Sequence, residues 1–267
     1  MIKAAVLGSP ISHSFSPLLH NTAYAQIGLS ASYEAIEVKA HSLAKFVDER
    51  DASWTGFSLT MPLKEEAISY AKHVDDLALR INSANTLYRK AGEWYATSTD
   101  VIGFRNALEM HKVDIKGHVV ILGAGATARA AAAACDSSQT QITVINRSLA
   151  RVQAMSDAVI ESELCFLNWD DLSVLAEADL VISTAPAGVT DSIELPAKTS
   201  APYFEALYKP WPTQASAMWA SRGGKVIDGL DLLIHQALAQ IAIFSGETFD
   251  SALMYSKLRE VGLAALK

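Results

Sequence analysis

The feature that most constrains the fold is a glycine-rich turn between an apolar run and an alanine-rich stretch. The run at 119–122 leads directly into Gly-Ala-Gly-Ala-Thr-Ala at 123–128, and alanine dominates the residues that follow. This order of strand, Gly-x-Gly-x-x-Ala and helix is typical of a turn that binds the pyrophosphate of a dinucleotide. The predicted cofactor-binding residues of the turn are Gly123, Gly125, Ala126, Thr127 and Ala128. Glycines also mark ordinary turns, so the motif alone leaves a purely structural role open.

The residues after the next apolar run indicate which dinucleotide would bind. About 20 residues beyond the glycines, an NAD-binding domain usually has a carboxylate for the ribose hydroxyls. This chain has Asn146, Arg147 and Ser148 there, and Arg151 follows one helical turn later. Guanidinium and hydroxyl groups suit a 2′-phosphate, so these residues are predicted to bind NADP. The alternative is a solvated helix start with both arginines idle on the surface.

The chain as a whole alternates short apolar runs with longer helical patterns, which predicts an α/β fold with largely parallel sheets. A length of 267 residues suits two domains. We expect an N-terminal α/β substrate domain at 1–102 and a Rossmann-like NADP-binding domain at 103–232. The remaining residues, 233–267, exceed what the second domain requires, so the final helices are predicted to return to the first domain. The active site is expected in the cleft between the two.

Individual elements are predicted from apolar runs and turn residues. The expected strands are 3–7, 33–38, 56–59, 85–88 and 94–97, then one from 118, then 142–145, 180–184, 203–207 and 225–227. Ser16 before Pro17 predicts a helix N-cap, and Gly28 is expected to end that helix. A second helix is expected at 101–111, and a hairpin turn at 90–93.

Charge and cysteine content restrict the partners. There are 22 Lys and Arg against 29 Asp and Glu, a net charge of −7, which argues against nucleic acid. The cysteines, Cys135 and Cys165, form neither a disulfide framework nor a metal-ligand cluster. His13 and His20 lie seven apart without a third ligand, so no metal is expected. The first apolar run stops at Gly8, and no run is long enough to cross a membrane. We therefore expect a cytoplasmic protein.

The first loop is rich in hydroxyl groups. It reads Gly-Ser-Pro-Ile-Ser-His-Ser-Phe-Ser-Pro-Leu-Leu-His-Asn over 8–21, between a predicted strand and a predicted helix. Hydroxyls at a helix N-terminus can hold a carboxylate without carrying charge. The alternative is that Ser14 and Ser16 only cap the helix.

This loop makes the chain similar to the shikimate dehydrogenase family, whose first loop carries Gly-x-Pro-Ile-x-His-Ser-x-Ser-Pro-x-x-His-Asn. Further family motifs follow in order and cover both domains: Ser58 to Lys64, Ala84 to Leu87, Ser98 to Asp100 with Gly103, the 123–128 turn, Asn146-Arg147, Tyr208-Lys209-Pro210, and Gly229-Leu230 followed by Gln236. The resemblance implies reversible reduction of 3-dehydroshikimate to shikimate by NADPH.

The resemblance also implies residue roles. Lys64 and Asp100 would be the catalytic pair, and Ser14 and Ser16 would hold the substrate carboxylate. The other implied substrate-binding residues are Thr60, Asn85, Tyr208 and Gln236, and Gly229 would contact the cofactor. Hydride transfer to or from an alcohol requires a titratable group beside the oxygen, and Lys64 can serve. Whether Lys64 or Asp100 carries the proton stays open. The alternative for Lys64 is a surface lysine at a helix start, and the alternative for Asp100 is the N-cap of the next helix.

Two departures from the family pattern concern specificity. The family usually has Asn where this chain has Ser58 and Ser98, and serine is shorter and lacks the amide. A quinate or aminoshikimate dehydrogenase of the same superfamily is therefore the closest rival. A non-catalytic paralogue is a further alternative, and the presence of Lys64 and Asp100 argues against it. A folate-type methylene dehydrogenase is another, and the two-serine loop argues against it. Glu205 is given no role, and monomer and homodimer both stay open.

Overall fold

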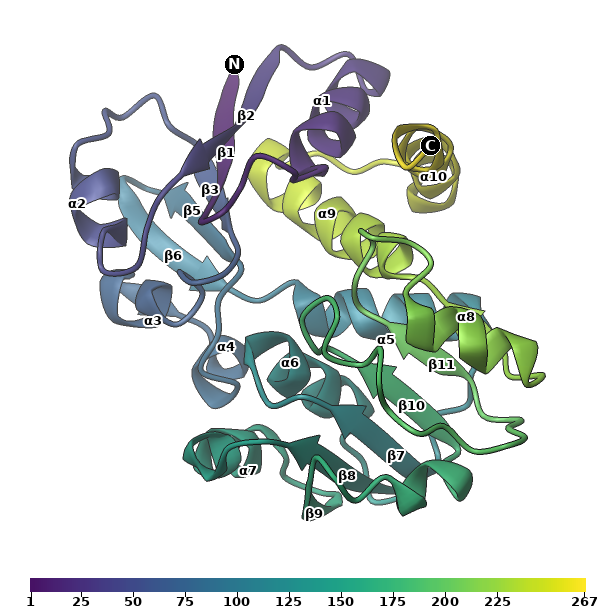
Figure 1. Cartoon of the computed structure of the whole chain (residues 1–267). Coiled ribbons are helices and arrows are strands. Elements are labelled where there is room, and N and C mark those ends of the chain that lie inside the picture. The colour runs from purple at the N-terminus through teal and green to yellow at the C-terminus, as the bar shows by residue number, and fades with distance from the viewer. The chain divides into compact units, whose positions relative to one another are not determined.

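The chain folds into two units, each built on a six-stranded sheet (Figure 1). This computed structural model describes residues 1–267 apart from the side chain of Leu149. The first unit contains Met1–Asp100 and Ile234–Lys267, and the second contains Val101–Leu233. The predicted α/β fold class is confirmed, including the return of the C-terminal helices to the first unit.

The sheet of the first unit has the order β2-β1-β3-β5-β6-β4. Its strands are β1 (Ile2–Gly8), β2 (Ala31–Glu37), β3 (Gly56–Leu59), β4 (His73–Val74), β5 (Thr86–Lys90) and β6 (Glu93–Thr97). β1 lies parallel to both β2 and β3, so the carboxyl ends of β1 and β3 meet at one edge of the sheet. β5 and β6 form the expected hairpin, and its turn residues Ala91 and Gly92 have φ of 52° and 84°.

The helices of the first unit are α1 (Ser16–Gln26), α2 (Leu43–Asp48), α3 (Glu66–Tyr70), α4 (Asp76–Arg80) and α10 (Ser251–Ala265), and α9 (Gly229–Ser245) and α5 (Asp100–Met110) each belong partly to it. α10 packs against α1, near the start of the chain (Figure 1). The C-terminal stretch is two helices, because Gly246 has φ of 70° and ends α9. On the sheet, Phe57 packs between the rings of Trp54 and Trp94, with centroids 5.0 and 5.5 Å away.

The sheet of the second unit has the order β12-β11-β10-β7-β8-β9, and all its strand pairs are parallel. Its elements are β7 (Gly117–Leu122), α6 (Ala126–Cys135), β8 (Thr140–Asn146), η1 (Leu149–Arg151), α7 (Val152–Ala158), β9 (Glu163–Asn168), η2 (Ser173–Ala176), β10 (Leu180–Ser183), β11 (Tyr203–Glu205), α8 (Gln214–Ser221) and β12 (Val226–Ile227). The strand order reverses between β7 and β10. In doubly wound folds a dinucleotide binds outside the carboxyl ends of the strands at this reversal.

Two local predictions were wrong. Ser16 is not the N-cap of α1: Phe15 holds that position, and its side chain makes no capping bond. Instead the Ser16 backbone N–H donates to Ser14 Oγ at 3.3 Å, which makes a turn just before the helix. The strand predicted at 203–207 ends at Glu205, because the Leu207 N–H donates to the Glu205 side chain at 3.2 Å rather than to a neighbouring strand.

Glu205 is a fully buried carboxyl group at the end of β11. It accepts hydrogen bonds from the Leu207 N–H and from Thr213 Oγ1 at 3.0 Å, and Thr213 is the N-cap of α8. Burial disfavours the charged form and raises the pKa of Glu205 to about 7. The carboxyl group therefore ties the 206–212 loop to the sheet, and its ionisation in the folded protein costs free energy.

We expect the Glu205→Gln variant to gain stability relative to wild type as pH rises. Below about pH 7 the folded protein keeps Glu205 protonated, whereas the unfolded chain ionises it above its ordinary pKa, so the wild-type free energy of unfolding falls across this window. The amide cannot ionise. Its advantage over wild type should grow by about 3 kcal/mol between about pH 5 and about pH 8. Urea unfolding measures this, with Glu177→Gln at an exposed position as control. An equal pH dependence in both variants would contradict the assignment.

Candidate active site

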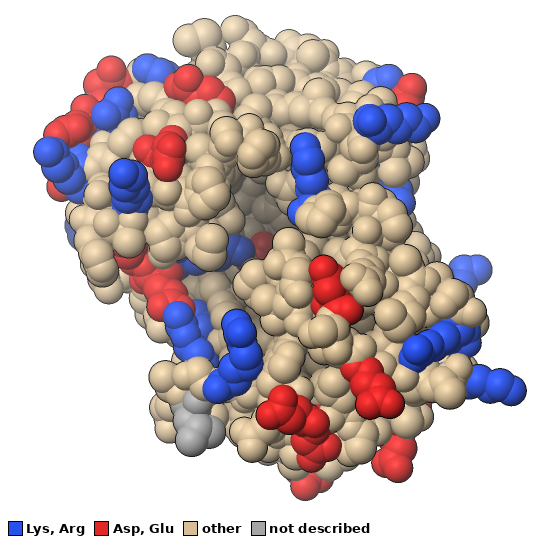
Figure 2. All heavy atoms as spheres, in the orientation of Figure 1, with Lys and Arg blue, Asp and Glu red and all other residues tan. Residues whose placement is uncertain are grey.

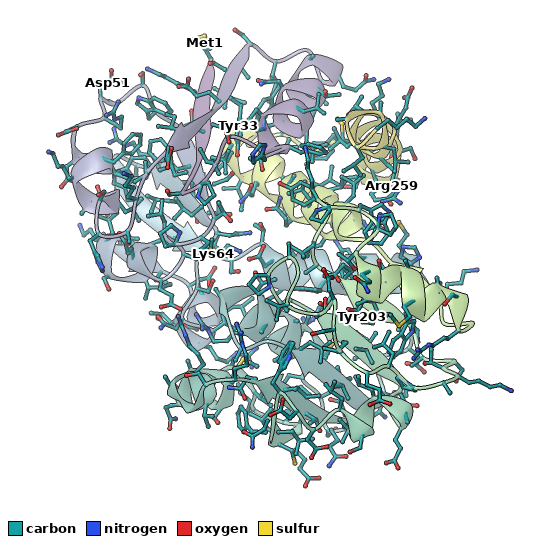
Figure 3. The ribbon with its side chains drawn as sticks, in the orientation of Figure 1. Met1, Tyr33, Asp51, Lys64, Tyr203 and Arg259 are labelled. Carbon is teal, nitrogen blue, oxygen red and sulfur yellow. The ribbon has the colours of Figure 1, made fainter. Side chains whose placement is uncertain are left out.

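The centre of the candidate site is an ion pair between Lys64 and Asp100. Lys64 lies in the turn between β3 and α3 (Figure 3), and its Nζ is 2.6 Å from Asp100 Oδ2. The two side chains are 13% and 7% exposed, so Lys64 is not the surface lysine of the alternative interpretation. Its backbone carbonyl accepts from the Ala84 N–H at 2.9 Å, which fixes the turn against the segment before β5.

Asn85 holds the other oxygen of Asp100. Its Nδ2 donates to Asp100 Oδ1 at 2.8 Å, and Thr99 Oγ1 and Gln236 Oε1 lie 2.9 and 3.3 Å from the same nitrogen. The Thr99 backbone N–H, which can only donate, lies 2.8 Å from Asn85 Oδ1. The amide oxygen must therefore face Thr99, so the amide nitrogen faces Asp100. The fold thus brings together Lys64, Asn85, Asp100 and Gln236, which the sequence motifs had singled out separately.

The carboxylate of Asp100 accepts hydrogen bonds from side chains and does not serve as a helix cap. α5 begins at Asp100, but the bonds of the carboxylate go to Lys64 and Asn85. A buried charge is stable only when it is paired and its remaining oxygens are hydrogen-bonded, and both conditions hold here. The arrangement places an ammonium group of fixed orientation at the carboxyl end of β3. Such an ammonium group can give a proton to an oxygen, and its neutral amine form can receive one.

The loops after β1 and β3 lie against each other. A Cβ at Gly8 would come within 2.4 Å of Thr60 Cγ2, and the Ser9 N–H donates to the Met61 carbonyl at 3.0 Å. Ser14 is half-buried and Ser16 is buried, both at the N-terminus of α1, where the N-cap residue Phe15 makes no side-chain cap. This edge of the sheet therefore carries the hydroxyls of Ser14 and Ser16, together with Thr60.

The glycine-rich turn of the second unit fits a pyrophosphate. Gly123 has φ of 110°, and a Cβ there would lie 2.7 Å from Thr184 Oγ1, so the fold itself requires this glycine. Gly125 is the N-cap of α6 and has an ordinary φ of −82°. A Cβ at Gly125 would meet nothing within 4 Å, so it would fill open space at the helix N-terminus. Ala126 and Thr127 begin α6, and Ala128 is fully buried against the sheet.

The residues that were predicted to bind the 2′-phosphate lie at the end of β8 and just after it. Asn146 is buried, and its Nδ2 donates to the Ser148 carbonyl at 2.6 Å, which shapes the turn. Arg147 and Arg151 are exposed. Ser148 Oγ accepts from the Ala150 N–H at 3.3 Å and is also exposed. Arg147 therefore lies in a turn that a buried asparagine holds, and Arg151 is the last residue of η1.

Tyr208 and Gly229 belong to the second unit. Tyr208 is half-buried on the loop between β11 and α8. A Cβ at Gly229 would lie 2.4 Å from the Ala206 carbonyl oxygen, so the start of α9 packs directly against this loop. The contact gives Gly229 a packing role whether or not it meets a cofactor.

Sequence reasoning missed several residues of the hydrogen-bonded group. Thr99 and Thr86 bond Asn85, and their position beside Asn85 and Asp100 in two motifs was the available signal. Gln240 donates to the Asn85 carbonyl at 2.9 Å, and only its spacing of four from Gln236 on a helix could have indicated it. Ser98, by contrast, is buried and its hydroxyl has no hydrogen-bond partner among the described residues.

The structure also bears on metal-binding and membrane-spanning features and on surface charge. Within the described part of the chain, no group of three or more His, Cys, Asp or Glu side chains could hold a metal ion. None of the described helices is long and apolar enough to span a membrane. On the face drawn in Figure 2, described Lys and Arg side chains are interspersed with Asp and Glu side chains.

The chain is similar to known proteins in both sequence and structure. The shikimate dehydrogenase substrate binding domain family matches residues 6–87, and the shikimate / quinate 5-dehydrogenase family matches residues 107–190. The shikimate dehydrogenase (NADP(+)) of Ignicoccus hospitalis is 32% identical over 248 residues, covering 91% of this chain and 92% of that protein. That of Thermosynechococcus vestitus is 33% identical over 268 residues, covering 95% and 93%.

Solved structures of related proteins have a similar fold over nearly the whole length of this chain. Mycobacterium tuberculosis shikimate dehydrogenase has a TM-score of 0.86 and 34% identity, covering 97% of this chain and 100% of that one. The Thermus thermophilus enzyme in complex with NADP(H) and shikimate has a TM-score of 0.86 and 30% identity, covering 97% and 99%. With sequence relatives above 30% identity along both units, this chain belongs to the shikimate dehydrogenase family.

Proposed function

We propose that this chain is an NADP-dependent shikimate dehydrogenase, which interconverts 3-dehydroshikimate and shikimate in the pathway to chorismate and the aromatic amino acids. The observation that carries the proposal is the buried Lys64–Asp100 pair held by Asn85. The sequence relatives named as shikimate dehydrogenase (NADP(+)) support the same activity. So does the related Thermus thermophilus structure with NADP(H) and shikimate.

The chemistry assigns the Lys64–Asp100 pair to proton transfer. Oxidation of shikimate breaks one C–H bond and one O–H bond of the same alcohol, and the products are 3-dehydroshikimate, NADPH and a proton. Bound NADP supplies the hydride acceptor in this direction and the donor in the other. Lys64, oriented by Asp100, receives the hydroxyl proton as a neutral amine during oxidation, and as the ammonium ion it returns that proton during reduction.

Other polar groups of the first unit would orient the ring. Ser14 and Ser16 hold the carboxylate, because their hydroxyls and the N-terminus of α1 offer donors without a buried positive charge. Thr60, Asn85 and Gln236 bind ring hydroxyls, and Tyr208 completes the substrate contacts. In this scheme residues 1–102 with 233–267 form the substrate-binding domain.

Residues 103–232 would then form the NADP-binding domain. The turn at Gly123, Gly125, Ala126, Thr127 and Ala128 holds the pyrophosphate with backbone N–H groups. Arg147 binds the 2′-phosphate, and Asn146, Ser148 and Arg151 support it. Gly229 is the remaining cofactor contact. A cytoplasmic location and a monomeric or homodimeric state stay predictions.

A quinate or aminoshikimate dehydrogenase is the second candidate. The observation in its favour is that serines replace the usual asparagines at 58 and 98, and that the Ser98 hydroxyl lacks a partner in the described structure. Initial rates with shikimate and quinate, each with NADP and with NAD, distinguish the candidates. A higher kcat/KM for quinate than for shikimate would overturn the main proposal.

Replacing Lys64 by alanine should lower kcat by roughly a hundredfold to ten-thousandfold, because general acid–base catalysis contributes about that factor. The KM for shikimate should change far less, since the carboxylate is bound elsewhere. Lys72→Ala is the control, because Lys72 is an exposed lysine of the same unit that pairs with Glu93. Steady-state kinetics of both variants make the comparison, and a near-wild-type kcat for Lys64→Ala would remove Lys64 from proton transfer.

The Ser14→Ala and Ser16→Ala double variant should raise the KM for shikimate and leave kcat comparatively unaffected. Each hydrogen bond to a charged group contributes about 1.5–3 kcal/mol, which is roughly tenfold to a hundredfold in affinity. Ser42→Ala is a matched control, because Ser42 holds the N-cap of α2 and makes no capping bond. If the double variant loses only thermal stability, the serines have a structural role.

The Arg147→Ala variant should weaken NADP binding by roughly tenfold to a hundredfold and leave NAD binding unchanged, because NAD has no 2′-phosphate. Titration with each cofactor, followed by fluorescence or calorimetry, measures the two affinities. Equal loss for NADP and NAD would show that Arg147 does not read the 2′-phosphate. A wild-type enzyme that already binds both equally would show the same.

Gly125→Ala is the complementary variant. The new methyl group meets no protein atom within 4 Å, so the melting temperature should stay at the wild-type value. The methyl group would, however, occupy the space that a pyrophosphate needs at the N-terminus of α6. Affinity for NADP and NAD should therefore fall together with their ratio unchanged, and undiminished affinity for both would argue against this cradle.

A further inference from the structure

Tyr33, Ser58 and Gln240 are three buried polar side chains that form a chain of hydrogen bonds ending at Asn85. Asn85 in turn bonds Asp100 of the Lys64–Asp100 pair. Tyr33 on β2 (Figure 3) lies with its hydroxyl 2.6 Å from Ser58 Oγ on β3. Ser58 Oγ is in turn 2.6 Å from Gln240 Oε1 on α9. The three residues are 3%, 4% and 1% exposed, so water does not compete for these bonds.

The direction of every hydrogen bond in this chain is fixed by a backbone group. Gln240 Nε2 lies 2.9 Å from the Asn85 carbonyl oxygen, which can only accept, so the amide nitrogen of Gln240 faces Asn85. Its oxygen then faces Ser58, which must donate its only hydrogen there. Ser58 can therefore only accept from the Tyr33 hydroxyl.

The same direction continues to Asp100. Gln240 Nε2 also donates to Thr86 Oγ1 at 2.9 Å, and Thr86 Oγ1 donates to Asn85 Oδ1 at 2.8 Å. The amide of Asn85 is thereby held with its nitrogen toward Asp100. Hydrogen bonds that all point one way polarise one another, which strengthens each of them in a buried site. The final donor of the chain is the group that holds the Asp100 carboxylate.

The start of the chain is itself rigid. The side chain of Asn21 bonds both the backbone N–H and the carbonyl of Tyr33, at 3.1 and 2.8 Å. The ring of His20 stacks on the Tyr33 ring at 3.9 Å and 14°. Burial lowers the pKa of His20 to about 3, so this ring is neutral, and burial raises the pKa of Tyr33, so its hydroxyl keeps its proton.

We propose that Tyr33, Ser58 and Gln240 are positioning residues for the reaction: their one-way chain of hydrogen bonds orients Asn85 and, through it, the Lys64–Asp100 pair. This inference rests on the proposed function. It also assigns Ser58 a role that differs from that of a substrate ligand. The hydroxyl hydrogen of Ser58 is committed to Gln240, so Ser58 has no donor to offer a ring hydroxyl.

A matched pair of tyrosine variants tests the proposal in the full-length enzyme. Tyr33→Phe removes the first donor and keeps the ring stacked on His20. Tyr24→Phe removes an equally buried hydroxyl that bonds His20 Nδ1 at 3.2 Å and lies outside the chain. Tyr33→Phe should lower kcat severalfold with a smaller change in the KM for shikimate, and Tyr24→Phe should leave both near wild type.

Gln240→Met breaks the chain at its centre while keeping a side chain of similar shape. We expect kcat to fall by about tenfold to a hundredfold, because a small misplacement of catalytic groups costs that much. The loss should exceed any rise in KM. If Gln240→Met changes only KM, or if Tyr33→Phe and Tyr24→Phe have equal kcat, the positioning role is wrong.

A second readout does not depend on turnover. The rate at which acetic anhydride acetylates Lys64, followed by mass spectrometry of peptides, reports how firmly the ammonium group is held by Asp100. Gln240→Met and Tyr33→Phe should acetylate Lys64 severalfold faster than wild type and Tyr24→Phe. Equal rates in all four proteins would overturn the network. Absence of wild-type shikimate turnover with NADP, alongside faster labelling in the variants, would instead overturn the proposed function and leave the network standing.

Discussion

The carboxylate of Asp100 is the constraint on which the first unit depends. It is nearly buried, and a buried charge must have every oxygen engaged. Lys64 occupies one oxygen and Asn85 the other. Because Asn85 is also hydrogen-bonded by Thr99 and by Gln240, the segments before β5 and α5 and the helix α9 are all fixed relative to the same charge. Removing one partner would leave an unpaired ion in a largely buried site.

This constraint explains why the end of the chain returns to the first unit. Gln236 and Gln240 are four residues apart, so they lie on one face of α9. Both reach Asn85, one at its side-chain nitrogen and the other at its backbone carbonyl. The sheet of the first unit therefore gains its buried polar partners from residues more than 150 positions away, with separations of 151 and 155. Truncation before α9 would expose the site and also leave its polar groups unsatisfied.

The sequence predicted the features that local chemistry determines. The glycine turn at 123–128 and the hairpin at 90–93 each need particular backbone angles, and the residues there reveal them. β9 was missed because its side chains are mostly half-buried, and β4 because it is only 2 residues long. The N-cap predicted at Ser16 was wrong, because Phe15 is the N-cap of α1 and Ser14 Oγ accepts a hydrogen bond from the Ser16 N–H. Gln240 and Tyr33 could not be predicted, since their role depends on contacts between distant elements.

The two glycines at the predicted cofactor turn differ in what the fold requires of them. Gly123 is required by the backbone and by its contact with Thr184, whereas Gly125 leaves its surroundings empty. A lineage that no longer needed hydride chemistry could therefore lose it through a single added methyl group and keep its folding, abundance and buried polar network. Inactive members of such a lineage would share the fold of the working enzymes and differ from them at position 125.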